Sequence, residues 1–394
     1  MFESAITAVI GIDTDAETFS FYVDLGDKRE AQQVVSYRCR PFCEEFYQKL
    51  DKAIKNYQQR NPSVSLAKVA IVLSDDAFLM DTINVPTINR RAMENSLEVA
   101  IGATYKNKKE LRYRTYPLNQ NKQFSTFGVV GIRKDILDKL QEVCAANQVG
   151  IHSVTSAANA MACGAMALNG RLRNGTYLLL DVKENCCRYA FVNKGRVIGA
   201  YYLPFGEAIL YKSRLVSEDL LFDHSSGELL VLNANEKAKA KHITMMGEEV
   251  LTDPDAMPEE IEEEEEEDEA MFVAAAGNGK RTGRKLPKFM QRELPTDREG
   301  FVYENFRIIL KWTLDVLAGN PTITAQGPID MVYVNMSKEY DFLFPRLNSE
   351  EEGHRVKFVP LLPGNGYSDL SADAHDLELY GGFQLRQFGK LNNF

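Results

Sequence analysis

The stretch that decides the fold is "AVIGIDTDAETFSFYVD", residues 8–24. An apolar strand ends at Asp13, a short acidic turn follows, and "TFSFYVD" alternates apolar and polar residues as a second strand does. A third strand in "QQVVSYRC" completes a β-meander over residues 5–38. Because a turn at the end of a strand can bind a phosphate through its backbone amides, the turn after Asp13 is a candidate phosphate site.

The same pattern returns at residues 176–204, "TYLLLDVKENCCRYAFVNKGRVIGAYYLP". A buried strand carries Asp181 near its end, a turn follows at Lys183, and two further strands close a second meander. A repeated meander with an aspartate at the end of each first strand predicts two similar halves that face one cleft. We therefore expect Asp13 and Asp181 to face each other across that cleft.

Residues 75–150 follow a different pattern. A strand ends at Pro86, an amphipathic helix spans 87–105, two alternating strands follow, and a second helix runs from Lys134 to about Asn147. This β-α-β-β-α order predicts a small inserted subdomain. The alternative is that the segment continues the first domain.

Charge is unevenly distributed along the 394 residues, whose formal net charge is −10. An acidic balance argues against nucleic-acid binding, since a phosphate backbone is held by clustered Lys and Arg. Residues 259–269 alone carry ten carboxylates, and a basic segment follows at 280–292. Self-repulsion and low apolar content predict a disordered insertion at about 252–298, which is either a solvated loop or an electrostatic tether.

Membrane spans and metal sites are not expected. No window approaches the run of apolar residues that crosses a bilayer, and no basic flank precedes the first apolar stretch. The six cysteines are scattered without the two-residue spacing of zinc ligands, and the five histidines form no cluster. Reduced thiols in an intracellular compartment are the expectation.

Taken in order, these motifs resemble the actin, Hsp70 and sugar-kinase superfold, and within it the PilM branch of the FtsA-like proteins, which assemble type IV pilus and type II secretion machinery. "AVIGIDTD" and "TYLLLDV" are similar to the two phosphate hairpins of that family. "VYENFRIILKWTLDVL" resembles a later helix, here with Glu304, Arg307 and Trp312. "IDMVYVNMSKEYDFLFPRLN" resembles the adenosine-side strand and helix, and "ELYGGFQLR" the final helix, so the resemblance spans nearly the whole chain.

The resemblance implies an α/β, actin-like (ribonuclease H-like) fold of two lobes with duplicated three-strand meanders. Lobe 1 would comprise residues 1–74. An inserted partner-binding subdomain would span 75–150, and lobe 2 would span 151–394 with the charged insertion inside it.

The nucleotide site of the family is altered in this chain. In ATP-binding members a glycine follows each hairpin aspartate directly, because backbone amides must approach the phosphates. Thr14 and Val182 stand at those positions, and Asn335 and Met336 stand where the adenosine strand normally ends in two glycines. The residues that the resemblance places in this degenerate nucleotide cleft are Asp13, Thr14, Asp181, Lys183, Glu304 and Asn335.

Charge favours a pseudo-ATPase without a catalytic residue or a resident metal. The acidic side chains expected to converge on the cleft include Asp15, Glu17 and Glu184, with Lys183 and Lys338 as the obvious cations. Uncompensated carboxylates oppose polyphosphate binding. The expectation is that no cofactor is needed, and ATP with Mg²⁺ is the alternative, since paired aspartates can hold that ion.

The resemblance implies a non-catalytic cytoplasmic scaffold that would dock the cytoplasmic N-terminal tail of a PilN-like inner-membrane protein. It would lie at the inner face of the membrane through that partner, and self-association stays open. The candidate partner surface, which an extended peptide would contact, is Leu79, Ile83, Val85, Met93, Leu97 and Ile101. The alternatives are an actin-like ATPase or kinase that uses the cleft, and an FtsA-like division tether.

Overall fold

The computed structural model describes most of the first half of the chain and separate parts of the second. The described residues are 6–14, 16–24, 29–105, 108–120, 122–183, 186–203, 206–207, 210, 222–223, 228–229, 299–300, 302–307, 310, 314, 329, 331–349, 356–361 and 377–388. The charged insertion predicted at 252–298 lies outside them.

The first lobe is built on a five-stranded sheet in the order β3-β2-β1-β4-β8. Strands β1, β2 and β3 are antiparallel, as in the predicted meander, whereas β1, β4 and β8 run parallel. β1 is central and buried along almost its whole length, which its apolar sequence "AVIGI" allows. The strands are β1 (Ala8–Asp13), β2 (Thr18–Asp24), β3 (Arg29–Ser36), β4 (Val69–Leu73) and β8 (Ile151–Ser156).

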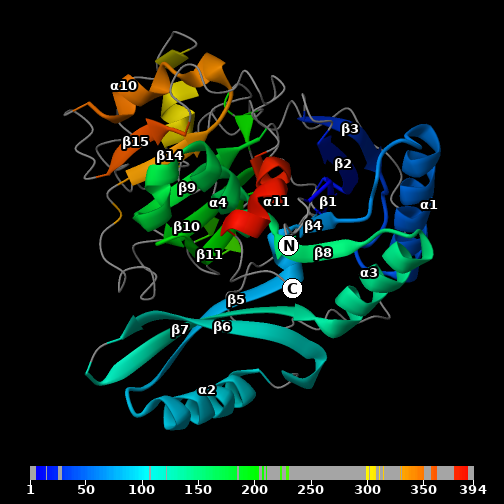
Figure 1. Cartoon of the computed structure of the whole chain (residues 1–394). Coiled ribbons are helices and arrows are strands. Elements are labelled where there is room, and N and C mark those ends of the chain that lie inside the picture. The colour runs from blue at the N-terminus through cyan, green and yellow to red at the C-terminus, as the bar shows by residue number, and fades with distance from the viewer. Residues whose placement is uncertain are drawn as a thin grey trace, which may run out of the picture.

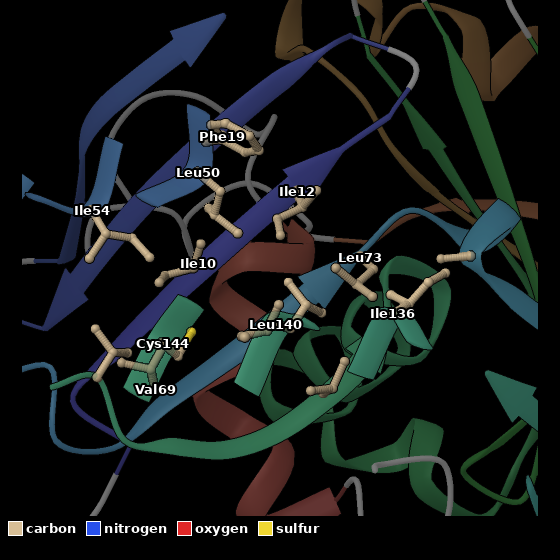
Figure 2. Close-up of a cluster of buried hydrophobic side chains, with 14 of the residues drawn as sticks. Ile10, Ile12, Phe19, Leu50, Ile54, Val69, Leu73, Ile136, Leu140 and Cys144 are labelled. Atoms are coloured by element: carbon tan, nitrogen blue, oxygen red, sulfur yellow. The ribbon is translucent and has the colours of Figure 1, made fainter. Parts of the chain in front are cut away.

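Two helices, α1 (Glu44–Arg60) and α3 (Lys134–Ala146), pack on one face of this sheet. Figure 2 shows Leu140 and Cys144 of α3 close to Ile10 of β1, with Leu50 of α1 in the same cluster. The apolar residues of both helices recur at helical spacing, so each helix buries one stripe. This cluster is the core of lobe 1.

The second lobe repeats the arrangement with the order β11-β10-β9-β14-β15. Three antiparallel strands are again followed by two parallel ones, paired β9 to β14 and β14 to β15. The strands of this sheet are β9 (Thr176–Val182), β10 (Cys187–Asn193), β11 (Arg196–Leu203), β14 (Met331–Asn335) and β15 (Lys357–Pro360). Helix α10 (Leu343–Leu347) lies between β14 and β15 in the sequence. A separate hairpin is formed by β12 (Phe222–Asp223) and β13 (Glu228–Leu229). The predicted duplication is confirmed, and the molecule has an actin-like fold of two lobes.

The inserted subdomain is a three-stranded antiparallel sheet in the order β5-β7-β6 with one helix, α2. Its elements are β5 (Phe78–Pro86), α2 (Arg90–Thr104), β6 (Leu111–Gln120) and β7 (Phe124–Arg133). Figure 1 shows this unit projecting from both lobes. Short 3₁₀ turns lie at Asp75–Ala77, Lys108–Glu110, Gly170–Asn174 and Lys338–Tyr340.

The predicted boundaries of the subdomain and the lobes need correction. Helix α3 falls inside the predicted 75–150 subdomain but buries Ile136 and Leu140 in the core of lobe 1. Strand β8, assigned by prediction to lobe 2, pairs with β4 and extends lobe 1 to Ser156. An apolar stripe reveals that a helix is packed, but not which sheet it covers.

Helices α4 (Ala157–Leu168) and α11 (Leu377–Phe388) pack against each other between the two sheets, as Figure 1 shows. Gly381 makes this approach possible, because a Cβ atom there would lie 1.7 Å from the carbonyl oxygen of Ala160. Gly382 faces lobe 1 in the same way, with Val9 at 2.7 Å from a would-be Cβ. The two glycines therefore serve helix packing, and they fix the position of Glu378 one turn earlier.

Candidate functional site

The turn after β1 satisfies its own backbone amides. The amide of Thr14 donates to Ser74 Oγ at 2.9 Å, and the amide of Ala16 donates to Asp13 Oδ1 at 3.0 Å. The hydroxyl of Thr14 donates to Asp76 Oδ1 at 2.8 Å, and Thr14 is buried. Two amides that a phosphate loop would offer to a ligand are thus bonded within the protein.

The equivalent aspartate of lobe 2, Asp181, is fully buried near the end of β9. The side-chain amide of Asn335, which is opposite it on β14, donates to Asp181 Oδ1 at 2.6 Å. Burial raises the pKa of Asp181 to about 7, and the nearby carboxylate of Glu378 adds to the rise. Asp181 Oδ2 has no hydrogen-bond partner among the described residues.

Arg188 lies at the centre of the junction between the lobes. It is on β10, directly across from Asp181 in the strand register, and its side chain is only 2% exposed. Its Nη2 atom is 2.9 Å from Asp13 Oδ2 of lobe 1, and its Nη1 atom is 3.4 Å from Glu378 Oε1 of α11. One guanidinium therefore joins the first sheet, the second sheet and the last described helix.

Lys183 adds a second cation and pairs with Glu378 Oε1. Burial alone would lower the pKa of Lys183, but the Glu378 carboxylate raises it above its ordinary value. The ammonium group is therefore charged and held within the protein.

A further carboxyl group, that of Asp75, reaches this region from the turn after β4. Its Oδ1 atom accepts from the amide of Ala158 in the first turn of α4 at 2.9 Å, whereas its Oδ2 atom is buried without a described partner. Burial raises the pKa of Asp75 to about 6, although Arg188 acts in the opposite direction. We define the junction cluster as Asp13, Asp75, Asp181, Lys183, Arg188 and Glu378.

The sequence analysis located part of this cluster. It named Asp13, Asp181, Lys183 and Asn335, and the structure brings all four to the lobe junction. Arg188 was missed, although an arginine inside the apolar strand "CCRYAFVN" is a detectable signal, since a buried charge requires a partner.

The described contacts of Glu304 do not include a residue of the junction cluster. It lies in the helical residues 302–307 and accepts from Arg307 Nε at 3.0 Å and Nη2 at 2.8 Å. Asp15, Glu184, Trp312 and the side chain of Lys338 lie outside the described part of the chain. The prediction that they line the cleft therefore stays a prediction.

The six candidate partner-binding residues gather in the core of the subdomain. Leu79 and Met93 are partly buried, and the remaining four are buried between α2 and the sheet: Ile83, Val85, Leu97 and Ile101. These four cannot contact a peptide directly while α2 stays in place. Partner binding by the subdomain as a whole remains a prediction.

The subdomain is also fixed to lobe 2. The hydroxyl of Tyr116 on β6 donates to the carbonyl of Val197 at 2.6 Å, and Arg196 donates to the carbonyl of Pro117 at 2.5 Å. Gly128 makes room for the Tyr116 ring, because a Cβ atom there would lie 2.5 Å from it. Val130 and Ile132 of β7 belong to the core of lobe 1, so the subdomain contacts both lobes.

The described residues hold no group of three or more histidine, cysteine or acidic side chains that could bind a metal. Likewise, among the helices that the structure describes, none is long and apolar enough to cross a membrane.

Comparison with solved structures identifies the class of fold. A chain of the PilM–PilN type IV pilus biogenesis complex is 12% identical, and the match covers 98% of this chain and 99% of that one with a TM-score of 0.52. The cytoplasmic domain of EpsL, an inner-membrane component of the type II secretion system of Vibrio cholerae, is 13% identical over 57% of this chain and 79% of that one, with a TM-score of 0.35.

A Bacteroides thetaiotaomicron protein with an actin-like ATPase fold is 15% identical over 52% of this chain and 74% of that one, with a TM-score of 0.29. No family model matches the sequence, and no curated protein matches it. The predicted resemblance to the PilM branch is confirmed at the level of the fold.

Proposed function

We propose that this protein is a scaffold of a type IV pilus or related secretion assembly platform. The observation that carries the proposal is the full-length likeness to a chain of the PilM–PilN complex, which extends over 98% of the residues. A likeness of this extent includes both lobes and the inserted subdomain. We propose that the scaffold binds the cytoplasmic N-terminal tail of a PilN-like inner-membrane protein.

The subdomain is the part to which we assign tail binding. β5 is an edge strand of its sheet, so an extended peptide can add to it through main-chain hydrogen bonds. Asn84 and Pro86 are exposed on this strand, whereas Val85 points into the core beneath α2. In this arrangement the buried candidate residues support the strand, and the partly buried Leu79 and Met93 remain candidates for contact.

The junction cluster supports a scaffold that works without nucleotide. ATP with Mg²⁺ is what the fold family implies, but the residues present do not suit it. Thr14 and Ala16 already use their amides internally, and the Arg188 guanidinium is paired with carboxylates from two elements. A polyphosphate would have to break these bonds and approach several buried carboxyl groups.

Calorimetry with two ligands tests this proposal. Mg-ATP should give little or no heat up to roughly millimolar concentration, where binding is worth only about 4 kcal/mol. The cytoplasmic tail of a PilN-like protein from the same genome should bind with micromolar affinity, about 8 kcal/mol. Tight ATP binding without tail binding would contradict the proposal.

An actin-like ATPase or kinase is the second candidate, and Asp181 is the observation that favours it. A buried carboxyl group with a pKa of about 7 and an unpartnered oxygen has the properties of a general base. An enzyme of this kind should release phosphate from ATP and lose that activity in Asp181→Asn. Phosphate release that persists in this variant at the wild-type rate would point to a contaminant.

A further inference from the structure

The end of the subdomain farthest from α3 displays apolar side chains. Figure 1 shows the β6–β7 hairpin and the start of α2 at this end. Phe124, the first residue of β7, is 50% exposed, and Ile88, in the loop before α2, is 44% exposed. Exposed apolar side chains that lie next to each other can mark a surface that contacts another molecule.

The backbone segments that carry these side chains are joined to each other. Pro86 and Phe124 are opposite each other in the register of β5 and β7. Thr87 follows Pro86, and its backbone amide donates a hydrogen bond to the carbonyl of Gln123 at 2.9 Å. The hydroxyl of Thr87 lies 3.0 Å from the hydroxyl of Ser125. The two segments therefore present one preformed surface, which lowers the entropy cost of binding.

The charge of these two segments is opposite to that of the whole chain. Residues 84–91 and 119–126 contain Arg90, Arg91 and Lys122 and no carboxylate, in a chain of net charge −10. The Arg91 and Lys122 side chains are exposed. We define the subdomain tip as Pro86, Ile88, Arg91, Lys122 and Phe124.

We propose that the subdomain tip docks directly onto an anionic lipid surface. Exposed aliphatic and aromatic groups beside lysine and arginine suit the boundary between headgroups and acyl chains, where the apolar groups insert and the cations meet anionic headgroups. This proposal rests on the proposed function, because a protein that binds the cytoplasmic tail of a membrane protein is held close to the bilayer. The tip then gives the scaffold its own contact with that bilayer.

Cosedimentation of the full chain with vesicles, without any partner peptide, tests the inference. The protein should bind vesicles of equal parts phosphatidylglycerol and phosphatidylcholine and should not bind phosphatidylcholine alone. Lys122→Gln should weaken binding about fivefold, the factor that corresponds to one cation near an anionic surface. Phe124→Asp should weaken it further, because it replaces an inserting ring with a repelled charge.

Val34→Asp is the matched control, because Val34 is 63% exposed on β3 of lobe 1, outside the tip. Its vesicle binding should equal that of the wild type. Equal losses in Val34→Asp and Phe124→Asp would overturn the proposal, as would the absence of binding to either vesicle.

Calorimetry of the tail peptide with the same variants separates this inference from the proposed function. If tip variants lose vesicle binding and keep peptide binding, both stand. If the wild type binds peptide and no vesicle, only this inference fails. If it binds anionic vesicles through the tip and no peptide, the tip stands and the tail-binding scaffold fails.

Discussion

Asp13 and Asp181 occupy corresponding positions in two sheets of the same strand order, and their surroundings differ. The Asp13 side chain is 21% exposed and forms an ion pair with Arg188. Asp181 is fully buried and receives its described hydrogen bond from an uncharged amide, that of Asn335. The comparison teaches that a duplicated fold fixes where two carboxyl groups lie, whereas the residues around each group decide whether it holds a charge or a proton.

The largest effect should come from removing the cation that forms an ion pair with Asp13. Arg188→Met leaves the carboxylates of Asp13 and Glu378 without the guanidinium between them, and breaking a buried pair from one side costs about 3 to 5 kcal/mol. Denaturant unfolding should show a loss of this size. Arg171→Met, at an exposed arginine of the same lobe, is the control and should change little. Equal losses would show that the junction cluster has no special role.

The next effect concerns the helix that brings Glu378 to Arg188. Gly381→Ala forces a methyl group against the carbonyl of Ala160, and overpacking of this kind costs about 1 to 3 kcal/mol despite the better helix propensity of alanine. Thermal unfolding should detect it. Gly170→Ala provides the comparison, because no atom lies within 4 Å of a Cβ there. A variant at Gly381 as stable as that at Gly170 would contradict the packing of α4 against α11.

A smaller effect should separate the two aspartates by pH. The pKa of Asp181 is about 7 when folded and about 4 when unfolded, so the folded state binds the extra proton between these values. The contribution of Asp181 to stability is therefore full below pH about 4 and is lost as the pH rises through about 7. Asp181→Asn, which cannot ionise, should become more stable relative to the wild type over this window, by about 1.4 kcal/mol for each pH unit between the two pKa values.

Unfolding free energies at several pH values measure this difference. Asp13→Asn should show no such gain at high pH, because it removes the partner of Arg188. Parallel pH curves for the wild type and Asp181→Asn would mean that Asp181 is ionised when folded.

The smallest effect should come from deleting residues 255–295. In the sequence this segment lies between β11 and β14 of lobe 2. The run is highly charged, and long loops add closure entropy only slowly, so the melting temperature should hardly change. Differential scanning calorimetry is sufficient to test this. A fall of many degrees would show that the segment packs against a lobe.

The sequence predicted the strands and their duplication because period-two alternation and a terminal aspartate are local signals. The sequence could not predict that α3 belongs to lobe 1, because the apolar stripe of a helix does not indicate which sheet the helix packs against. The apolar residues of α2 were named as a partner surface for the same reason: Leu97 and Ile101 have the spacing of a packed stripe whether the covering surface is a peptide or the chain's own sheet.

Arg188 was not predicted because its partners are far away in the sequence. Asp13 is 175 residues before it and Glu378 is 190 residues after it. Local patterns reveal a cation in an apolar strand but do not name what neutralises it. The degenerate glycine positions at Thr14 and Val182 were visible, whereas the ionic arrangement at the junction required the structure.

The separation of Arg188 and Glu378 along the sequence also affects the order of events during synthesis of the chain. At roughly 5 to 20 residues per second, a ribosome needs about 10 to 40 s to advance the 190 residues that divide them. During that interval β10 has been made, but α11 and its carboxylate have not. Lobe 2 then carries an arginine that is incompletely neutralised within an otherwise apolar strand, the kind of unfinished surface on which chaperones act. The junction cluster is therefore complete only after α11 has been made.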